Sequence, residues 1–182
     1  MRMRVKSAIC IALAGVGATT AVAIGSDGQK LRTDLNGFEE VPAVITDGTG
    51  EFKARISASE QKIDYELSFS GLEGGEVRQA HIHVGQETAT GGIVAWLCDS
   101  PTNPSPDVDT CPASGTVVGT IEPADVQVVP TQGFRGDPSM TADDRFAKLV
   151  RALRTGVAYA NVHTATSPSG EIRGQILKRQ ND

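Results

Sequence analysis

Short stretches in which apolar and polar residues alternate one by one are the feature that most restricts the fold of this chain. Because successive side chains of a β-strand point to opposite faces, a period of two predicts a strand with one buried and one solvated face. The clearest example has Ile63, Tyr65, Leu67 and Phe69 in alternation with polar residues. Further strands are predicted, with Gly- and Pro-containing turns between them, at 31–35, 52–56, 79–85, 93–97, 115–121, 157–164 and 171–177. Residues 25–30 are expected to form a flexible lead-in.

One helix interrupts this pattern, from about Ala142 to Arg154. Thr141 is a suitable N-cap, and Gly156 is the expected stop signal. Apolar residues recur there at helical spacing, namely Phe146, Leu149, Val150 and Leu153. Strands outnumber helices and do not alternate with them. We therefore predict a mainly β protein, an antiparallel β-sandwich or barrel of immunoglobulin-like or superoxide-dismutase-like type, with one short inserted helix.

The first 23 residues have the three parts of a secretory signal peptide. A basic start precedes an apolar run from Ala8 to Ala18, and Ala21-Val22-Ala23 has the small-x-small pattern of a cleavage site. We expect cleavage after Ala23 and a secreted or periplasmic location. A transmembrane anchor is disfavoured because the run is short and rich in Gly, Ala and Thr, and lipidation at Cys10 is disfavoured because no small residue precedes it. No later stretch is expected to span a membrane.

Composition excludes several further classes of function. The remaining residues, 24–182, have the length of a single domain, with its core at about 31–177. The formal net charge is −5 without a basic patch, so nucleic acid is not an expected partner. Once the leader is removed, Cys98 and Cys111 are the two cysteines left, and an even pair in an exported protein predicts a disulfide. Two thiols are too few for a Cys-only metal site.

All three histidines of the chain lie in two of the alternating stretches. His81 and His83 share one face of the 79–85 strand, and His163 lies on the polar face of the 157–164 strand. Two imidazoles from one strand and one from another supply three nitrogen ligands if they converge, and copper or zinc is the expected ion. The alternative is that histidines on the polar face of a sheet only hydrogen-bond to neighbours or water.

Four other polar residues are placed where they can support such a cluster. Tyr159 and Asn161 share the face of His163, and Glu171 and Arg173 share one face of the last predicted strand. These residues either orient the imidazoles or, for Glu171 and Arg173, form a surface ion pair. The sequence has no Gly-x-Ser-x-Gly, no His-Glu-x-x-His and no phosphate-binding Gly-rich loop. No catalytic residue is assigned.

Two groups of motifs, in this order, resemble the CHRD domain first recognised in chordin. The first group contains Leu35-Asn36-Gly37, Glu40-Val41-Pro42 and Ala80-His81-Ile82-His83-Val84-Gly85. The second contains Tyr159-Ala160-Asn161-Val162-His163-Thr164 and Pro168-Ser169-Gly170-Glu171-Ile172-Arg173-Gly174-Gln175-Ile176. The resemblance covers about residues 31–177, with 98–111 and 127–140 as insertions. It implies a secreted β-sandwich module of the single-domain bacterial type, without an established enzymatic activity.

A fainter likeness connects the chain with copper/zinc superoxide dismutase, which also has a His-x-His strand in an antiparallel sandwich. That family needs a larger set of histidines and an aspartate to hold two metals, and Arg173 is the one candidate for its guiding arginine. Two hypotheses follow. The first is a non-catalytic secreted module that binds an extracellular protein or matrix partner and holds one copper or zinc ion. The alternative is a metal-dependent redox enzyme that acts on a small oxygen species.

Overall fold

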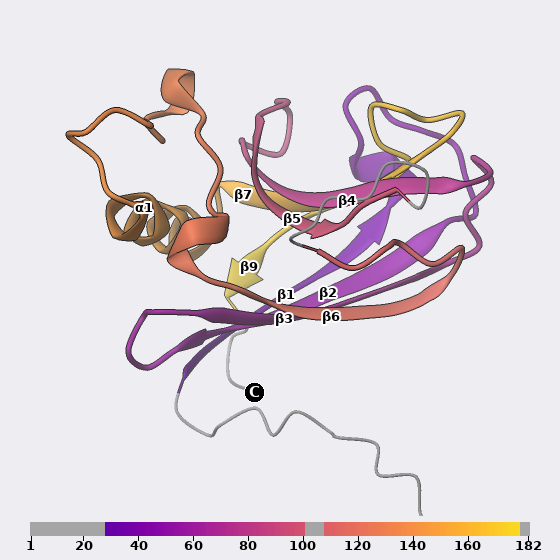
Figure 1. The fold of residues 1–182 in the computed structure, drawn as a ribbon. Coiled ribbons are helices and arrows are strands. Elements are labelled where there is room, and N and C mark those ends of the chain that lie inside the picture. The colour runs from indigo at the N-terminus through magenta and orange to yellow at the C-terminus, as the bar shows by residue number, and fades with distance from the viewer. Residues whose placement is uncertain (1–27, 101–107, 179–182) are drawn as a thin grey trace, which may run out of the picture.

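A computed structural model describes residues 28–100 and 108–178 and places all of their strands in one antiparallel sheet (Figure 1). The predicted signal peptide, 1–23, and part of the Pro-rich loop, 101–107, lie outside the described residues. The strands are β1 (Gly28–Asn36), β2 (Thr49–Ser57), β3 (Ile63–Ser70), β4 (Val77–Val84), β5 (Gly92–Cys98), β6 (Gly115–Ile121), β7 (Ala158–Thr164), β8 (Ile172–Gln175) and β9 (Leu177–Lys178). Their order is β5-β4-β7-β8-β1-β2-β3-β6, with β9 paired to β1.

The sheet folds over on itself to make two layers. Strands β4, β5 and β7 lie in the upper layer of Figure 1, and β1, β2, β3 and β6 lie in the lower one. The two ends of the sheet are tied together, because the Tyr65 hydroxyl on β3 donates a hydrogen bond of 2.7 Å to the carbonyl oxygen of Leu97 on β5. The predicted disulfide between Cys98 and Cys111 also forms, just ahead of β6. The result is a nearly closed, barrel-like sheet, which confirms the predicted fold class.

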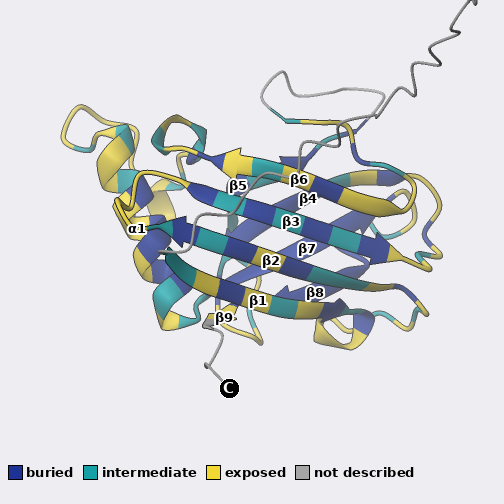
Figure 2. Cartoon of the chain, turned by 90° about the horizontal axis from the view of Figure 1, so that it is seen from below, coloured by how far each residue is buried: buried dark blue, intermediate teal, exposed yellow. Residues whose placement is uncertain are grey.

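Strands β2 and β3 show how the alternating pattern builds the core. They pair in antiparallel register with Phe52 opposite Leu67, and both side chains are fully buried. Seen from below, buried residues alternate with less buried ones along both strands (Figure 2). On the outer face Glu51 bridges Arg32 and Lys53, and such solvent-exposed ion pairs add little to stability. The hairpin predicted from the sequence is therefore confirmed.

Two strand boundaries differ from the prediction. The expected flexible lead-in is wrong for residues 28–30, because Gly28 already pairs with Ser57 and β1 begins there. The last predicted strand is divided in two at Ile176, which is buried. β8 lies between β7 and β1 and pairs with both, whereas β9 pairs with β1. Backbone pairing with neighbours that are distant in sequence decides both boundaries.

The one α-helix among the described residues, α1 (Ala142–Thr155), covers one end of the barrel (Figure 1), and three short 3-10 helices lie at 37–39, 123–125 and 130–132. Its capping box is complete, because the Thr141 side chain accepts from the Asp144 N–H and the Asp144 carboxylate accepts from the Thr141 N–H. Gly156 ends the helix in the left-handed conformation at φ 71°. The buried face of the helix consists of Phe146, Leu149, Val150, Ala152 and Leu153. No helix within 28–100 and 108–178 is both long and apolar enough to cross a bilayer.

Truncation of the core should cost far more stability than the same kind of change outside it. Leu67→Ala on β3 removes a fully buried side chain, so we expect a loss of about 2–5 kcal/mol in the free energy of unfolding. Val118→Ala on the neighbouring strand β6 is the matched control, because Val118 is 56% exposed. Urea unfolding of both variants measures the difference. Equal losses would show that this layer does not face the core.

Candidate metal centre

A layer of polar side chains covers the outer face of β4, β7 and β8. The β4–β7 register places Gln79 opposite His163, His81 opposite Asn161, and His83 opposite Tyr159. These pairs share one face because residues opposite each other in an antiparallel pair point the same way. The solvated polar face expected from the sequence is wrong here, since His81, His83 and His163 are only 1%, 7% and 7% exposed. Both faces of these strands are therefore buried.

Three loops bury this face, and each contacts it through a specific polar atom. The β4–β5 loop places the Gly91 carbonyl oxygen 2.9 Å from His83 Nδ1, and the β7–β8 loop places the Pro168 carbonyl oxygen 3.0 Å from His163 Nδ1. The β1–β2 loop brings Glu40 to Asn161. Figure 1 shows the three loops above β4. The covering of the histidines thus depends on loops that are far apart in the sequence.

The three histidines come together within this layer. Their ligand nitrogens all lie within 4.8 Å of one another. His81 Nδ1 is 3.2 Å from His163 Nε2, and the ring centroid of His163 lies 6.1 Å from that of His83. Nitrogens bonded to one tetrahedral ion at 2.0–2.1 Å lie about 3.4 Å apart. The widest pair would therefore have to approach by about 1.4 Å for all three nitrogens to share an ion.

Hydrogen bonds on the far side of each ring decide which nitrogen carries the proton. The carbonyl oxygens of Gly91 and Pro168 only accept, so His83 and His163 donate from Nδ1 and keep a bare lone pair at Nε2. His81 donates from Nε2 to Gln79 Oε1 at 3.0 Å, which leaves Nδ1 bare. Metal-ligating histidines are oriented in this way by acceptors behind the ring. Two of these bare nitrogens, His81 Nδ1 and His163 Nε2, lie 3.2 Å apart.

The His163 ring faces two acceptors within the cluster. With its proton on Nδ1, the bare Nε2 lies 3.2 Å from His81 Nδ1 and 2.9 Å from Asn161 Oδ1. If the proton moved to Nε2, that nitrogen could donate to one of them, but Nδ1 would then face the Pro168 carbonyl oxygen. A second proton on the ring or a metal ion between the nitrogens removes the repulsion. Nε2 of His83, which is buried, also has no hydrogen-bond partner among the described residues.

The extra proton is disfavoured by burial. Desolvation lowers the pKa of His81 to about 2, with the neighbouring His163 and His83 adding to the effect. Burial likewise lowers the pKa of His83 to about 4 and holds the pKa of His163 below its ordinary value. All three rings are therefore neutral near pH 7. Neutral imidazole is the form that ligates, so the cluster can hold a metal ion without first losing a proton.

Aromatic and cationic side chains pack around the imidazoles. Tyr159 stacks on His83 with ring centroids 4.8 Å apart, and the Arg173 guanidinium lies 3.4 Å from the centroid of the Tyr159 ring. Arg173 also donates to the Gln86 carbonyl oxygen at 2.8 Å. Trp96 meets the His81 ring edge to face at 4.3 Å. These contacts restrict the orientation of His81 and His83.

Glu171 has a different role from its neighbours. Its carboxylate accepts hydrogen bonds from the Thr46 and Thr164 hydroxyls and from the backbone N–H groups of Glu73 and Gly74. Although burial opposes it, these bonds hold the pKa of Glu171 below its ordinary value. The alternative of a surface ion pair with Arg173 is wrong, because both residues are only 1% exposed. Glu171 ties covering loops to the sheet.

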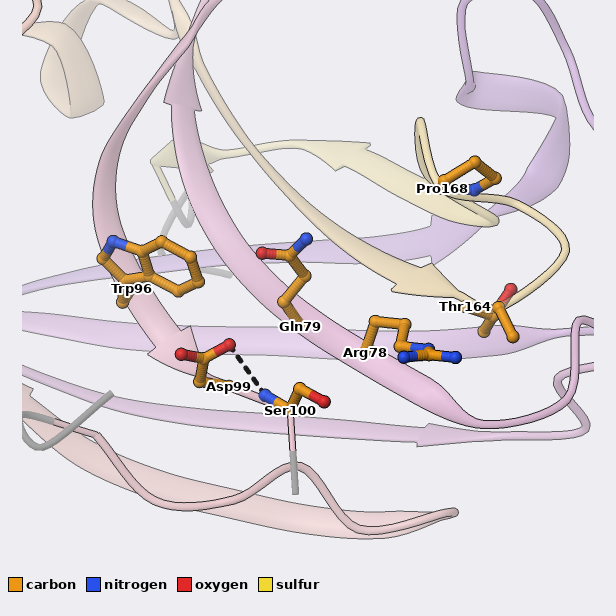
Figure 3. Close-up of a pocket in the computed structure, with 8 residues that line it drawn as sticks. Arg78, Gln79, Trp96, Asp99, Ser100, Thr164 and Pro168 are labelled. Carbon is orange, nitrogen blue, oxygen red and sulfur yellow. Dashed lines mark hydrogen bonds between the residues drawn. The ribbon is translucent and has the colours of Figure 1, made fainter. Parts of the chain in front are cut away.

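A cavity of about 420 Å³ lies beside the cluster (Figure 3). Its wall includes Gln79, Trp96 and Pro168, each of which contacts a histidine. Arg78 and Asp99 also line it. The cavity therefore borders the side of His81 and His163 that faces away from the converging nitrogens.

Sequence reasoning did not identify every residue of the site. Gln79 lies two residues before His81 on the same strand face, so the period of two was a usable signal for it. Glu40 and the Gly91 and Pro168 carbonyl oxygens gave no such signal, since they reach the cluster through loops. The predicted candidates His81, His83 and His163 are brought together, with Tyr159, Asn161 and Arg173 around them.

Glu40 should make the stability of the protein depend on pH. Burial raises the pKa of Glu40 from 4.5 to about 7, although the Asn161 hydrogen bond and the charge of Arg173 oppose the shift. The unfolded chain therefore loses this proton first, and stability falls as pH rises from about 4.5 to 7. We compare the free energy of unfolding of Glu40→Gln with that of the wild type at each pH. Between pH 4 and pH 8 this difference should change in favour of the variant by up to about 3 kcal/mol. Urea unfolding at both pH values measures it.

The control for this prediction is Glu39→Gln, which changes an exposed neighbour on the same loop. It should shift stability equally at the two pH values. A gain confined to high pH in Glu39→Gln, or its absence in Glu40→Gln, would contradict the assignment to Glu40.

Comparison with known proteins gives one match. A family model described as the CHRD domain matches residues 31–176, which is most of the chain. Neither a curated protein nor a solved structure matches significantly. The match includes β4, β7 and β8 with all three histidines, and it agrees with the resemblance noted from the sequence motifs. The chain therefore belongs to the CHRD domain family.

Proposed function

We propose that this protein is an exported, non-catalytic CHRD binding module that holds one copper or zinc ion through His81, His83 and His163. The observation that carries the proposal is the convergence of three buried histidines, whose ligand nitrogens lie within 4.8 Å of one another, with His83 Nε2 left without a hydrogen-bond partner among the described residues. Three neutral imidazoles suit both copper and zinc. Copper has the higher intrinsic affinity for such nitrogen sites.

The surrounding residues fit this assignment. Gln79, Gly91 and Pro168 accept the remaining N–H of each ring and so fix the orientation of the lone pairs. The ion, when bound, supplies a positive charge between the facing acceptors. The protein's own groups keep the site dry and hold the rings on two strands and beneath three loops. A bound ion would therefore connect β4 to β7 at the point where the loops close over them.

Export is supported by the leader and by the cysteine pair. The basic start, the apolar run and the Ala21-Val22-Ala23 pattern are those of a secretory signal peptide. The disulfide between Cys98 and Cys111 suits an oxidising compartment. We propose an extracellular protein or matrix component as the partner of the module. The absence of an assigned catalytic group in the sequence supports binding over turnover.

The metal site can be tested through Trp96, which is the only tryptophan in the chain. Because its ring lies 4.3 Å from that of His81, one equivalent of Cu²⁺ should quench its fluorescence. Zn²⁺ should compete with Cu²⁺ without quenching. In His83→Ala we expect the affinity to fall by at least on the order of 100-fold, as a lost ligand costs more than a lost supporting contact. Titration with metal analysis of the purified protein measures both effects.

The control variant is Arg78→Ala, which changes an exposed side chain on the same strand and should bind copper like the wild type. Circular dichroism of each variant confirms that it is folded. Fluorescence unchanged by copper in the wild type, or equal affinity in His83→Ala, would refute the site.

Export predicts a defined N-terminus. The chain recovered from the envelope or the medium of the native host should begin at Ile24, because cleavage follows Ala23. Mass spectrometry of the intact mature protein measures this and also detects the oxidised Cys98–Cys111 pair. A variant with Ala23 replaced by a bulky residue, Ala23→Phe, is the control and should accumulate uncleaved. Recovery of the wild type in the cytoplasm with Met1 or Arg2 at its start would contradict export.

A further inference from the structure

Asn161 lies at the centre of the histidine cluster. On β7 it is directly opposite His81 of β4, and it shares its strand face with His163 two residues away. Its side chain is only 2% exposed. Water therefore has little access to its carboxamide group.

The Asn161 oxygen already has the spacing of a metal ligand. Oδ1 is 2.9 Å from His163 Nε2, and His163 Nε2 is 3.2 Å from His81 Nδ1. Ligand atoms bonded at 2.0–2.1 Å are about 2.9 Å apart at right angles and about 3.4 Å apart in a tetrahedron. Both distances fall in this range, so the oxygen and the two nitrogens are placed as neighbouring ligands of one ion.

The orientation of the carboxamide group is the second observation. A neutral amide beside a bare imidazole nitrogen is expected to present its NH₂ group, which would donate a hydrogen bond. Here the NH₂ group is directed at Glu40 Oε1, 3.5 Å away, and the oxygen faces the nitrogen. Gly170 permits this arrangement, because it adopts φ +126° and a Cβ atom there would collide with both Glu40 and Asn161. With the His163 proton on Nδ1, where Pro168 accepts it, two acceptors face each other, and an ion between them makes this contact favourable.

We infer that Asn161 is the fourth protein ligand of the site through Oδ1, and that Glu40 is the residue that positions it. This inference rests on the proposed function and completes its coordination sphere. A carboxamide oxygen is a weak ligand of the kind that completes some three-coordinate copper sites. The protein itself then fills four positions around the ion, and neither a water molecule nor a small anion has a place on it. Such a closed sphere suits a resident ion and leaves no position for a substrate.

The test uses the copper-loaded protein and measures access of water and azide to the ion. We expect wild type to show no rapidly exchanging bound water in proton relaxation and no azide charge-transfer band. Asn161→Ala should gain both and lose on the order of 10- to 100-fold in copper affinity. Asn161→Asp, which keeps the oxygen and adds a charge, should stay closed and bind copper more tightly. Val118→Ala, an exposed change on β6 in the other layer, is the control and should behave like the wild type.

Each outcome decides the inference. Bound water and an azide band in wild type, equal to those of Asn161→Ala, would overturn the fourth ligand and leave the three-histidine site intact. If Asn161→Ala does not fold, the wild-type measurement and Asn161→Asp still decide. If wild type takes up no copper in the Trp96 titration, the proposed function fails as well, and that result is distinct from an open but occupied site.

Discussion

The antiparallel pairing of β4 with β7 is the constraint on which the rest of the site depends. It places His81 opposite Asn161 and Gln79 opposite His163, so that four polar side chains share one patch of sheet. A slip of β4 by one residue would turn Gln79 and His81 toward the core and separate them from Asn161 and His163. The same slip would expose Ala80 and Ile82, which are fully buried on the inner face. Burial of the inner face therefore fixes the geometry of the outer one.

Covering a polar face is costly unless each group finds a partner, and the loops show how this cost is met. Glu171 satisfies two hydroxyls and two backbone N–H groups at once and so anchors the loops that contain Thr46, Glu73 and Gly74. Arg173 is satisfied by the Tyr159 ring and the Gln86 carbonyl oxygen. Within the histidine cluster, His83 Nε2 has no hydrogen-bond partner among the described residues, and His163 Nε2 lies against two acceptors. This part of the layer coincides with the candidate ion position.

The loops that cover the cluster also form the outer surface of the module. The β1–β2 loop brings Glu40 against Asn161 on its inner side and exposes Phe38 and Ile45 to solvent. The conformation of the β1–β2 loop is therefore linked to the packing over the histidines. The interior contact at Asn161 and the exposed apolar surface are thus formed by different residues of one loop.

The sequence by itself determined the strands, the helix with its caps, the disulfide and the shared face of His81 and His83, because periodicity and capping are local properties of the chain. It also determined the CHRD family through its ordered motifs. Only the tertiary structure decided that the histidine face is buried, that Glu171 and Arg173 form no surface pair, and that Glu40 reaches Asn161. These features depend on loops that close over the sheet from distant parts of the chain. Alternation of residues predicts that a strand has two faces, but only the packing of other segments determines whether the second face meets water.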